Sequence, residues 1–305
     1  MIIKNRSKIC LMISATIMLV ALVMTIFGYG INYGIDFAGG LSIEYNMNAP
    51  FVQSDVETAL RGQGITDYKI STSGTEGTVL NIRIPKLDSD EEIQVLQAAL
   101  ESELLAKYPA MDVENATASY VGPTAGATLV KNAVLSVLIA SALMLLYIAI
   151  RFNFYSGAAA VLGLLHDVLI MISFMVILRN VIQMNSSFIA AMLTIVGYSI
   201  NNTIVIFDRI RENNTKTAYH SLPRDQVVNI SITESLGRTV NTTLTTLVTI
   251  VSLYVLGVAS IREFSLPIII GILSGLYSAN MINGYVWAFL ENHGNKFKKA
   301  KKKRK

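Results

Sequence analysis

The apolar residues of this chain fall into six separate runs instead of spreading as stripes along amphipathic helices. Each run is long enough to cross the roughly 30 Å hydrocarbon core of a bilayer as a helix. The pattern therefore predicts a polytopic α-helical membrane protein with six transmembrane helices. The expected spans are residues 9–27, 129–150, 155–178, 187–207, 239–258 and 266–290.

The first run, which follows Lys4, Arg6 and Lys8, also has the layout of a signal peptide. Its apolar stretch is longer than that of a signal peptide, and it lacks a small-residue cleavage site. We interpret it as an uncleaved anchor.

Residues 35–126 have the composition of a water-soluble domain and predict one α+β domain between the first two spans. A glycine-interrupted strand is expected over residues 34–45, and further strands over 68–72, 78–84 and 113–120. Two helices are expected to open with the capping boxes Ser54–Glu57 and Ser89–Glu92. The order strand, helix, strand, strand, helix, strand is that of a ferredoxin-like domain, although other two-layer sandwiches share it.

These patterns divide the chain into four parts. Residues 1–34 form a cytoplasmic N-terminus and the first span, 35–126 the α+β domain, 127–292 a five-helix bundle, and 293–305 a basic tail.

Charge predicts the orientation of the spans. The chain has 305 residues, a mean hydropathy of +0.49 and only 15% charged residues, against about a quarter in globular domains. Its basic clusters precede the first span, separate the fourth from the fifth, and fill the tail, so six spans place all three on one side. By the positive-inside rule that side is the cytoplasm, both termini are cytoplasmic, and the α+β domain is extracytoplasmic.

The same charges indicate membrane lipid, and not nucleic acid, as the partner of the tail. The single cysteine, Cys10, lies inside the first span, so neither a disulfide nor a zinc site is expected.

Polar residues inside spans are candidate functional sites because burying them in lipid is costly. Ser199, Asn202 and Thr203 lie in the fourth span, and we expect them to meet a polar face of the fifth. That face carries Arg238, Asn241 and Thr242 and is extended by Thr245 and Thr249. Hydroxyls and amides that merely join helices by hydrogen bonds are an equally good interpretation for the threonines.

His166 and Asp167 lie in the middle of the third span, about 18 Å from its end at 1.5 Å per residue. One interpretation is an acid neutralised by its neighbour and holding the bundle together; the other is proton handling. Neither a zinc protease nor a serine or aspartyl hydrolase can be assembled, because the further ligands, base or second carboxylate are missing. No Walker loop is present, so an ion gradient is the expected energy source.

Several segments together resemble the SecF half of the SecD/SecF family, within the resistance-nodulation-division superfamily. They are Gly34–Gly40, Val121–Thr124, Arg151-Phe152, His166-Asp167, Gly197–Thr203, Phe207–Glu212, Gly237–Thr242 and Ile272–Ser278. The resemblance implies a bacterial cytoplasmic-membrane subunit that pairs with SecD, docks on the SecYEG channel and uses a proton gradient to draw preproteins outward. No cofactor is expected.

One position departs from the family pattern. Where the resemblance implies a proton-carrying aspartate, this chain has Asn202, which cannot titrate, while Arg238 matches the arginine expected opposite that acid. We hypothesise that SecD supplies the acid and that Asn202 and Arg238 bind it, because an unpaired membrane arginine is costly. Coupling to sodium is the alternative, since amide and hydroxyl oxygens suit a hard cation.

Two other functions remain open. A small-molecule exporter of the same superfamily would share the helices, but its large paired exterior domains exceed the roughly ninety residues available. A scaffold subunit without ion coupling fits the loss of the acid at Asn202.

Overall fold

The computed structural model describes residues 3–73, 77–85, 90–257 and 259–302. It forms two compact units. The sheet unit is Tyr33–Val134 with Met184–Ser186, and the helical unit is Met1–Asn32, Leu135–Gln183 and Ser187–Lys305.

The described residues contain six helices that are long and apolar enough to cross a membrane, so the predicted number of spans is confirmed. The first five lie in α1 (Ile3–Ile26), α5 (Pro123–Arg151), α6 (Phe154–Ile177), α7 (Ser186–Thr215) and α8 (Arg224–Leu256). The sixth is built from α9 (Ala259–Ser278), a π-helical turn η3 (Ala279–Asn283) and α10 (Gly284–Lys302).

Two helices extend well beyond their apolar runs. Helix α7 continues past residue 207 to Thr215, and α8 begins at Arg224 and not near residue 239. The two extensions contact each other through an ion pair and a hydrogen bond. Arg209 Nε lies 2.7 Å from Glu234 Oε2, and Asn213 Nδ2 donates to Ser231 Oγ at 3.0 Å. Polar pairing therefore continues the helices where hydrophobicity alone predicted their ends.

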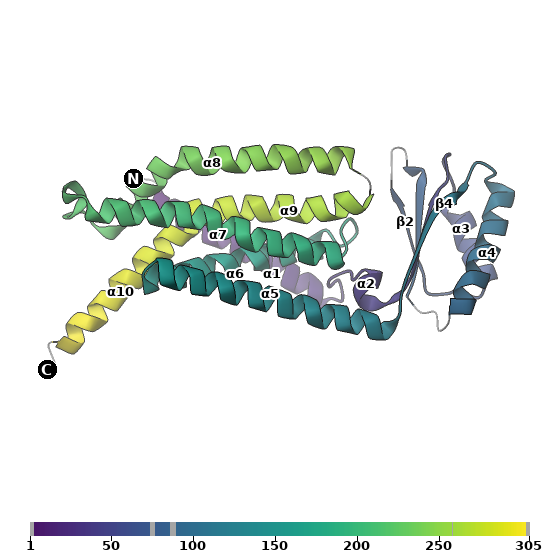
Figure 1. Ribbon diagram of the computed structural model, residues 1–305, viewed down its shortest axis with the longest axis horizontal. Helices are drawn as coiled ribbons and strands as arrows, with labels where there is room; N and C mark the ends of the chain where they lie inside the picture. Colours follow the sequence, from purple (N-terminus) through teal and green to yellow (C-terminus); the bar gives the residue numbers. More distant parts are fainter. Residues whose placement is uncertain (1–2, 74–76, 86–89, 258, 303–305) are drawn as a thin grey trace. The chain divides into compact units, whose positions relative to one another are not determined.

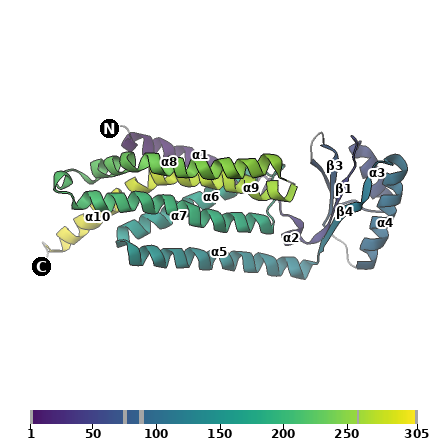
Figure 2. The same cartoon turned by 45° about the horizontal axis from the view of Figure 1, so that its top comes forward.

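The six described spans of the helical unit differ in burial. Of the most apolar stretch of each span, 56% is buried in α6, 50% in α7 and 61% in the sixth span, against none in α5 and 11% in each of α1 and α8. Both views place α5 and α8 at the edges of the bundle (Figures 1 and 2). Their outward faces are left for lipid or for another protein.

The sheet unit is a four-stranded antiparallel sheet with two helices on one face (Figure 1). Its strands are β1 (Gly40–Asn46), β2 (Lys69–Ser73), β3 (Val79–Ile84) and β4 (Asp112–Val121), in the spatial order β2-β3-β1-β4. Alternate residues of β3 (Leu80, Ile82 and Ile84) are buried against α3 (Gln53–Gly62) and α4 (Asp90–Lys107).

The strand expected over residues 34–45 is wrong in its first half. Residues Ile35–Ala38 form a helical turn, α2, and the strand begins at Gly40. Two glycines with positive φ, Gly39 (+77°) and Gly40 (+113°), make the change of direction. A Cβ on Gly40 would lie 2.3 Å from the carbonyl oxygen of Ile84, so the two backbones approach closely here.

The predicted capping box at Ser54 is also wrong. Helix α3 begins at Gln53, its N-cap is Val52, and no side chain caps it. Ser54 thus lies within the first turn and its carbonyl accepts from Thr58. Ser89 lies outside the described residues.

Asp55 connects the start of α3 to the end of α4 by hydrogen bonds. Its carboxylate accepts from Tyr108 Oη at 2.7 Å and from Lys107 Nζ at 3.2 Å. The hydrogen bond from Tyr108, followed by that from Lys107, lowers the pKa of Asp55. A carboxylate whose pKa is lower in the folded than in the unfolded state stabilises the fold at pH values above its unfolded-state pKa. This contribution is lost as the pH falls through the folded-state pKa.

We therefore expect the α3 amides of the full chain to exchange hydrogen faster in Asp55→Asn than in the unsubstituted protein at neutral pH. The difference should shrink on acidification below about pH 4, where the carboxylate becomes protonated. Tyr108→Phe, which keeps the charge, should show an intermediate effect. A difference that is independent of pH would contradict this account of Asp55.

Candidate functional site

The centre of the helical unit is a carboxylate with no exposed surface. Asp167 of α6 is 0% exposed and accepts hydrogen bonds from helices on two sides. Ser274 and Ser278 of α9 donate to its Oδ1 and Oδ2, each at 2.8 Å, and Ser199 of α7 donates to Oδ2. Three helices are thus joined through one side chain.

His166 completes the set of donors. Its Nδ1 lies 2.9 Å from Asp167 Oδ1, and because an ionised carboxylate has no proton, Nδ1 is the donor. Its Nε2 lies 2.7 Å from Ser14 Oγ on α1. In the neutral imidazole Nε2 accepts from Ser14, and after protonation it donates to Ser14.

His166 is the group that can carry a positive charge and lies against Asp167. The carboxylate of Asp167 already accepts from four donors, and among the described residues it forms no ion pair with a lysine or arginine. A buried carboxylate is costly unless it is paired. Protonation of His166 would supply the compensating charge at 2.9 Å.

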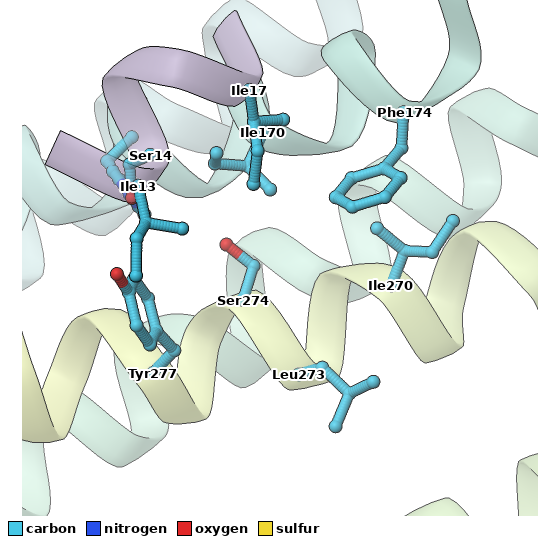
Figure 3. Close-up of a pocket in the computed structure, with 10 residues that line it drawn as sticks. Ile13, Ser14, Ile17, Ile170, Phe174, Ile270, Leu273, Ser274 and Tyr277 are labelled. Atoms are coloured by element: carbon cyan, nitrogen blue, oxygen red, sulfur yellow. The ribbon is translucent and has the colours of Figure 1, made fainter. Parts of the chain in front are cut away.

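A cavity of about 310 Å³ lies beside His166, between α1, α6 and α9 (Figure 3). Its polar lining is Ser14, His166, Ser274 and Tyr277, and the remaining wall is aliphatic or aromatic. The lining extends along α6 from His166 to Phe174, toward the end of the bundle where α1 and α6 finish and the chain enters the sheet unit.

The local sequence explains how α9 reaches Asp167. Ser274 and Ser278 are four residues apart and so share a helical face. Gly275 lies between them, and a Cβ there would come within 3.2 Å of Ser199 Cα. The small residue lets α9 approach α7 closely enough for both serines to bond the carboxylate. The π turn η3 follows directly, a feature frequent at functional sites.

A second polar cluster lies on the same helices nearer the other end. Asn283 Nδ2 donates to Thr203 Oγ1 at 2.9 Å, and both residues are buried. Asn202 is 1% exposed, and its Nδ2 has no hydrogen-bond partner among the described residues. Asn202 therefore faces the interior of this chain.

Arg238, Asn241 and Thr242 lie on an exposed face of α8. Thr242 Oγ1 bonds to the carbonyl of Arg238 in its own helix, at 2.8 Å. In the described part of the chain no carboxylate or side-chain acceptor contacts the guanidinium of Arg238. The expected joint site of Asn202 and Arg238 is thus not formed within this chain, because one side chain is buried and the other points outward.

The structure regroups the predicted residues. Ser199 joins His166 and Asp167, Thr203 joins Asn283, and the α8 face stands apart. The sequence reasoning missed Ser14, Ser274, Ser278 and Asn283. The i, i+4 spacing of Ser274 and Ser278 around a glycine was the available signal, and nothing local marked Ser14.

Metal binding finds no support in this geometry: no group of three or more histidine, cysteine, aspartate or glutamate side chains within the described ranges could hold a metal ion.

Six apolar helices, a small sheet unit after the first of them and a buried ionisable centre define a polytopic helical membrane protein. Residues 101–293 match the family described as protein export membrane protein SecD/SecF, C-terminal, and residues 25–50 match the SecD/SecF GG motif. The chain belongs to the SecD/SecF family.

Curated relatives support this assignment. The chain is 38% identical over 249 residues to the protein translocase subunit SecF of Thermodesulfovibrio yellowstonii, covering 81% of this chain and 80% of that one. It is 34% identical over 271 residues to the SecF subunit of Rickettsia bellii, covering 89% and 86%.

Solved structures show the same fold. The crystal structure of SecDF from Thermus thermophilus, a translocon-associated membrane protein, superposes with a TM-score of 0.77 at 34% identity over 94% of this chain. A SecDF structure in a super-membrane-facing form gives 0.66 at 31% identity over 98% of this chain. This chain spans only 38% and 39% of the length of those two chains.

Proposed function

We propose that this protein is a SecF-type accessory subunit of the Sec translocase, which pairs with SecD and uses an ion gradient to promote preprotein export through SecYEG. Similarity to SecF subunits over more than four fifths of the chain supports the export role. The observation that carries the ion drive is the fully buried carboxylate Asp167, whose nearest group able to become cationic is His166.

The transported proton binds His166 Nε2 and is held in place by Asp167. Ser14 passes it on from the cavity, because its hydroxyl accepts from the protonated ring and donates to the neutral one. Other titratable groups near the ring are Tyr277, stacked at 6.2 Å, and Cys10, whose carbonyl accepts from Tyr277 Oη. The cavity that borders His166 is lined by α1, α6 and α9, and in this proposal protons reach the ring through it.

The bare faces of α5 and α8 fit a partner that contributes to the site. Arg238 points out of a membrane helix and has no carboxylate partner among the residues that the structure describes, a costly arrangement unless another protein supplies one. An acid of SecD is the partner we propose. Asn202 takes no part in this contact, because it is buried within the chain.

The sheet unit is a ferredoxin-like domain in this proposal. The element order β1-α3-β2-β3-α4-β4 and the antiparallel order β2-β3-β1-β4 support it. The domain is extracytoplasmic and both termini are cytoplasmic in the bacterial membrane, as the basic clusters indicate.

Sodium is the competing ion. Both Asp167 oxygens and the hydroxyls of Ser199, Ser274 and Ser278 make five hard oxygen atoms in one place. Ser278 Oγ also lies 3.4 Å from the carbonyl oxygen of Gly275. The hydroxyl can therefore donate its proton to that carbonyl while its own oxygen binds a cation.

Export into inverted membrane vesicles tests the proposal under separately imposed proton and sodium gradients. Arg238→Ala should remove gradient-stimulated export, whereas Arg179→Ala, the same change at the opposite end of the bundle, should leave it intact. Asn202→Asp should alter the rate or the preferred ion. If neither Arg238→Ala nor Asn202→Asp changes export under either gradient, these two residues take no part in ion coupling.

A further inference from the structure

A second cavity, of about 340 Å³, lies at the far end of the helical unit from the first. The turn between α5 and α6, the end of α7, the start of α8 and helix α10 surround it. These are the places where the chain leaves its apolar spans, so the cavity lies at the depth of lipid headgroups.

Three arginines line this cavity. Arg151 lies 3.8 Å from Asp208, and Arg211 pairs more closely with the same carboxylate, at 2.8 Å. Arg224 lies 3.5 Å from Glu291 and also donates to Asn214 Oδ1 at 2.5 Å. Arg151 and Arg211 both lie over the ring of Phe152, at 5.5 and 5.8 Å from its centroid. The ring holds two guanidinium groups together, as a site for a phosphate requires.

Two polar atoms in the wall of the cavity have no hydrogen-bond partner within the described part of the chain. Trp287 is 1% exposed, and its Nε1, which can only donate, is unpaired; Glu291 Oε2, which can only accept when ionised, is unpaired as well. The two residues are one turn apart on α10. An occupant must therefore offer an acceptor to Trp287 and the arginines, and a donor to Glu291.

We propose that this cavity binds the phosphoethanolamine group of a phospholipid. The phosphate oxygens accept from Trp287 Nε1, Arg151 and Arg211, and the primary ammonium donates to Glu291. A purely anionic headgroup satisfies the arginines but leaves Glu291 Oε2 without a donor. A quaternary ammonium, as in phosphatidylcholine, has no N–H to donate.

Trp287 is the only tryptophan in the chain, so its fluorescence reports directly on this cavity. The full chain, purified in detergent, would be titrated with phosphatidylethanolamine, phosphatidylcholine and phosphatidylglycerol, and separately with soluble phosphoethanolamine and inorganic phosphate. We expect a saturable change in emission with phosphatidylethanolamine, at a Kd about tenfold lower than with the other two lipids. A tenfold difference corresponds to the one charge-assisted hydrogen bond that the other lipids cannot make to Glu291.

Variants separate the two contacts. Glu291→Gln should bring phosphatidylethanolamine and phosphatidylcholine to similar Kd values, and Arg151→Gln should weaken all three lipids. Arg179→Gln removes the same charge outside the cavity and should change nothing.

Equal Kd values for the three lipids in the unsubstituted chain, or no saturable change at all, would overturn the proposal. Soluble phosphoethanolamine binding as tightly as the lipid would overturn the lipid as the source of the group. Either result leaves the export function untouched, because export is measured independently of Trp287.

Discussion

Asp167→Asn is expected to abolish gradient-stimulated export and to lower the stability of the helical unit. The carboxylate accepts from Ser199, Ser274, Ser278 and His166. An amide replaces one acceptor oxygen by an NH₂ group that faces donors, so at least one buried hydrogen bond is lost and others are strained. Leaving a buried donor unsatisfied costs about 1–3 kcal/mol, more for a charged group.

Export into vesicles and thermal unfolding of the full chain measure the two effects of Asp167→Asn. Asp67→Asn, which makes the same change at an exposed position, is the matched control. Ser14→Ala separates proton transfer from stability, because it removes the contact to His166 Nε2 and leaves the shell of Asp167 complete. Undiminished gradient-stimulated export by both Asp167→Asn and Ser14→Ala would exclude this centre from ion coupling.

Gly40→Ala is expected to unfold the sheet unit or prevent its formation. The position has φ +113°, and an added Cβ would lie 2.3 Å from Ile84 O and 2.8 Å from Pro85 Cα. Both neighbours are backbone atoms, at the last residue of β3 and the residue after it, and they cannot move aside without disturbing the pairing of β1 with β3. Overpacking and backbone strain each cost about 1–3 kcal/mol, so their sum is a large part of a small domain's stability.

Gly64→Ala is the matched control for Gly40→Ala. Gly64 also has positive φ, +78°, but no atom lies within 4 Å of its added Cβ. Only the backbone term of about 1–2 kcal/mol should appear there. Hydrogen exchange of the β1 and β3 amides in the full chain measures both variants, and equal effects would refute the steric argument for Gly40.

The spans could be predicted from the sequence because an uninterrupted apolar run of this length has few stable structures other than a membrane-spanning helix. The ends of α7 and α8 could not, since pairs such as Arg209 with Glu234 join residues on different helices. The turn at Ile35–Ala38 was missed for a similar reason. The two glycines indicated a special backbone, but not that the segment before them is helical.

The candidate site was predictable at its centre and not in its surroundings. The cost of burying a charge singled out His166 and Asp167 from the sequence. The serines that bond Asp167 come from α7 and α9, and Ser14, which bonds His166, comes from α1; only the rotation of each helix decides which hydroxyls face inward. The same rotation separates Asn202 from Arg238, two residues that the sequence pattern placed together.

The most direct test of an ion-driven export subunit is the completion of preprotein export in vesicles that contain SecD and SecYEG, with and without this chain. The gradient would be present in one set and collapsed by an ionophore in the other. The account predicts that the chain accelerates export only while the gradient is present. Equal acceleration after the gradient has collapsed would contradict it and show that the chain acts as a scaffold.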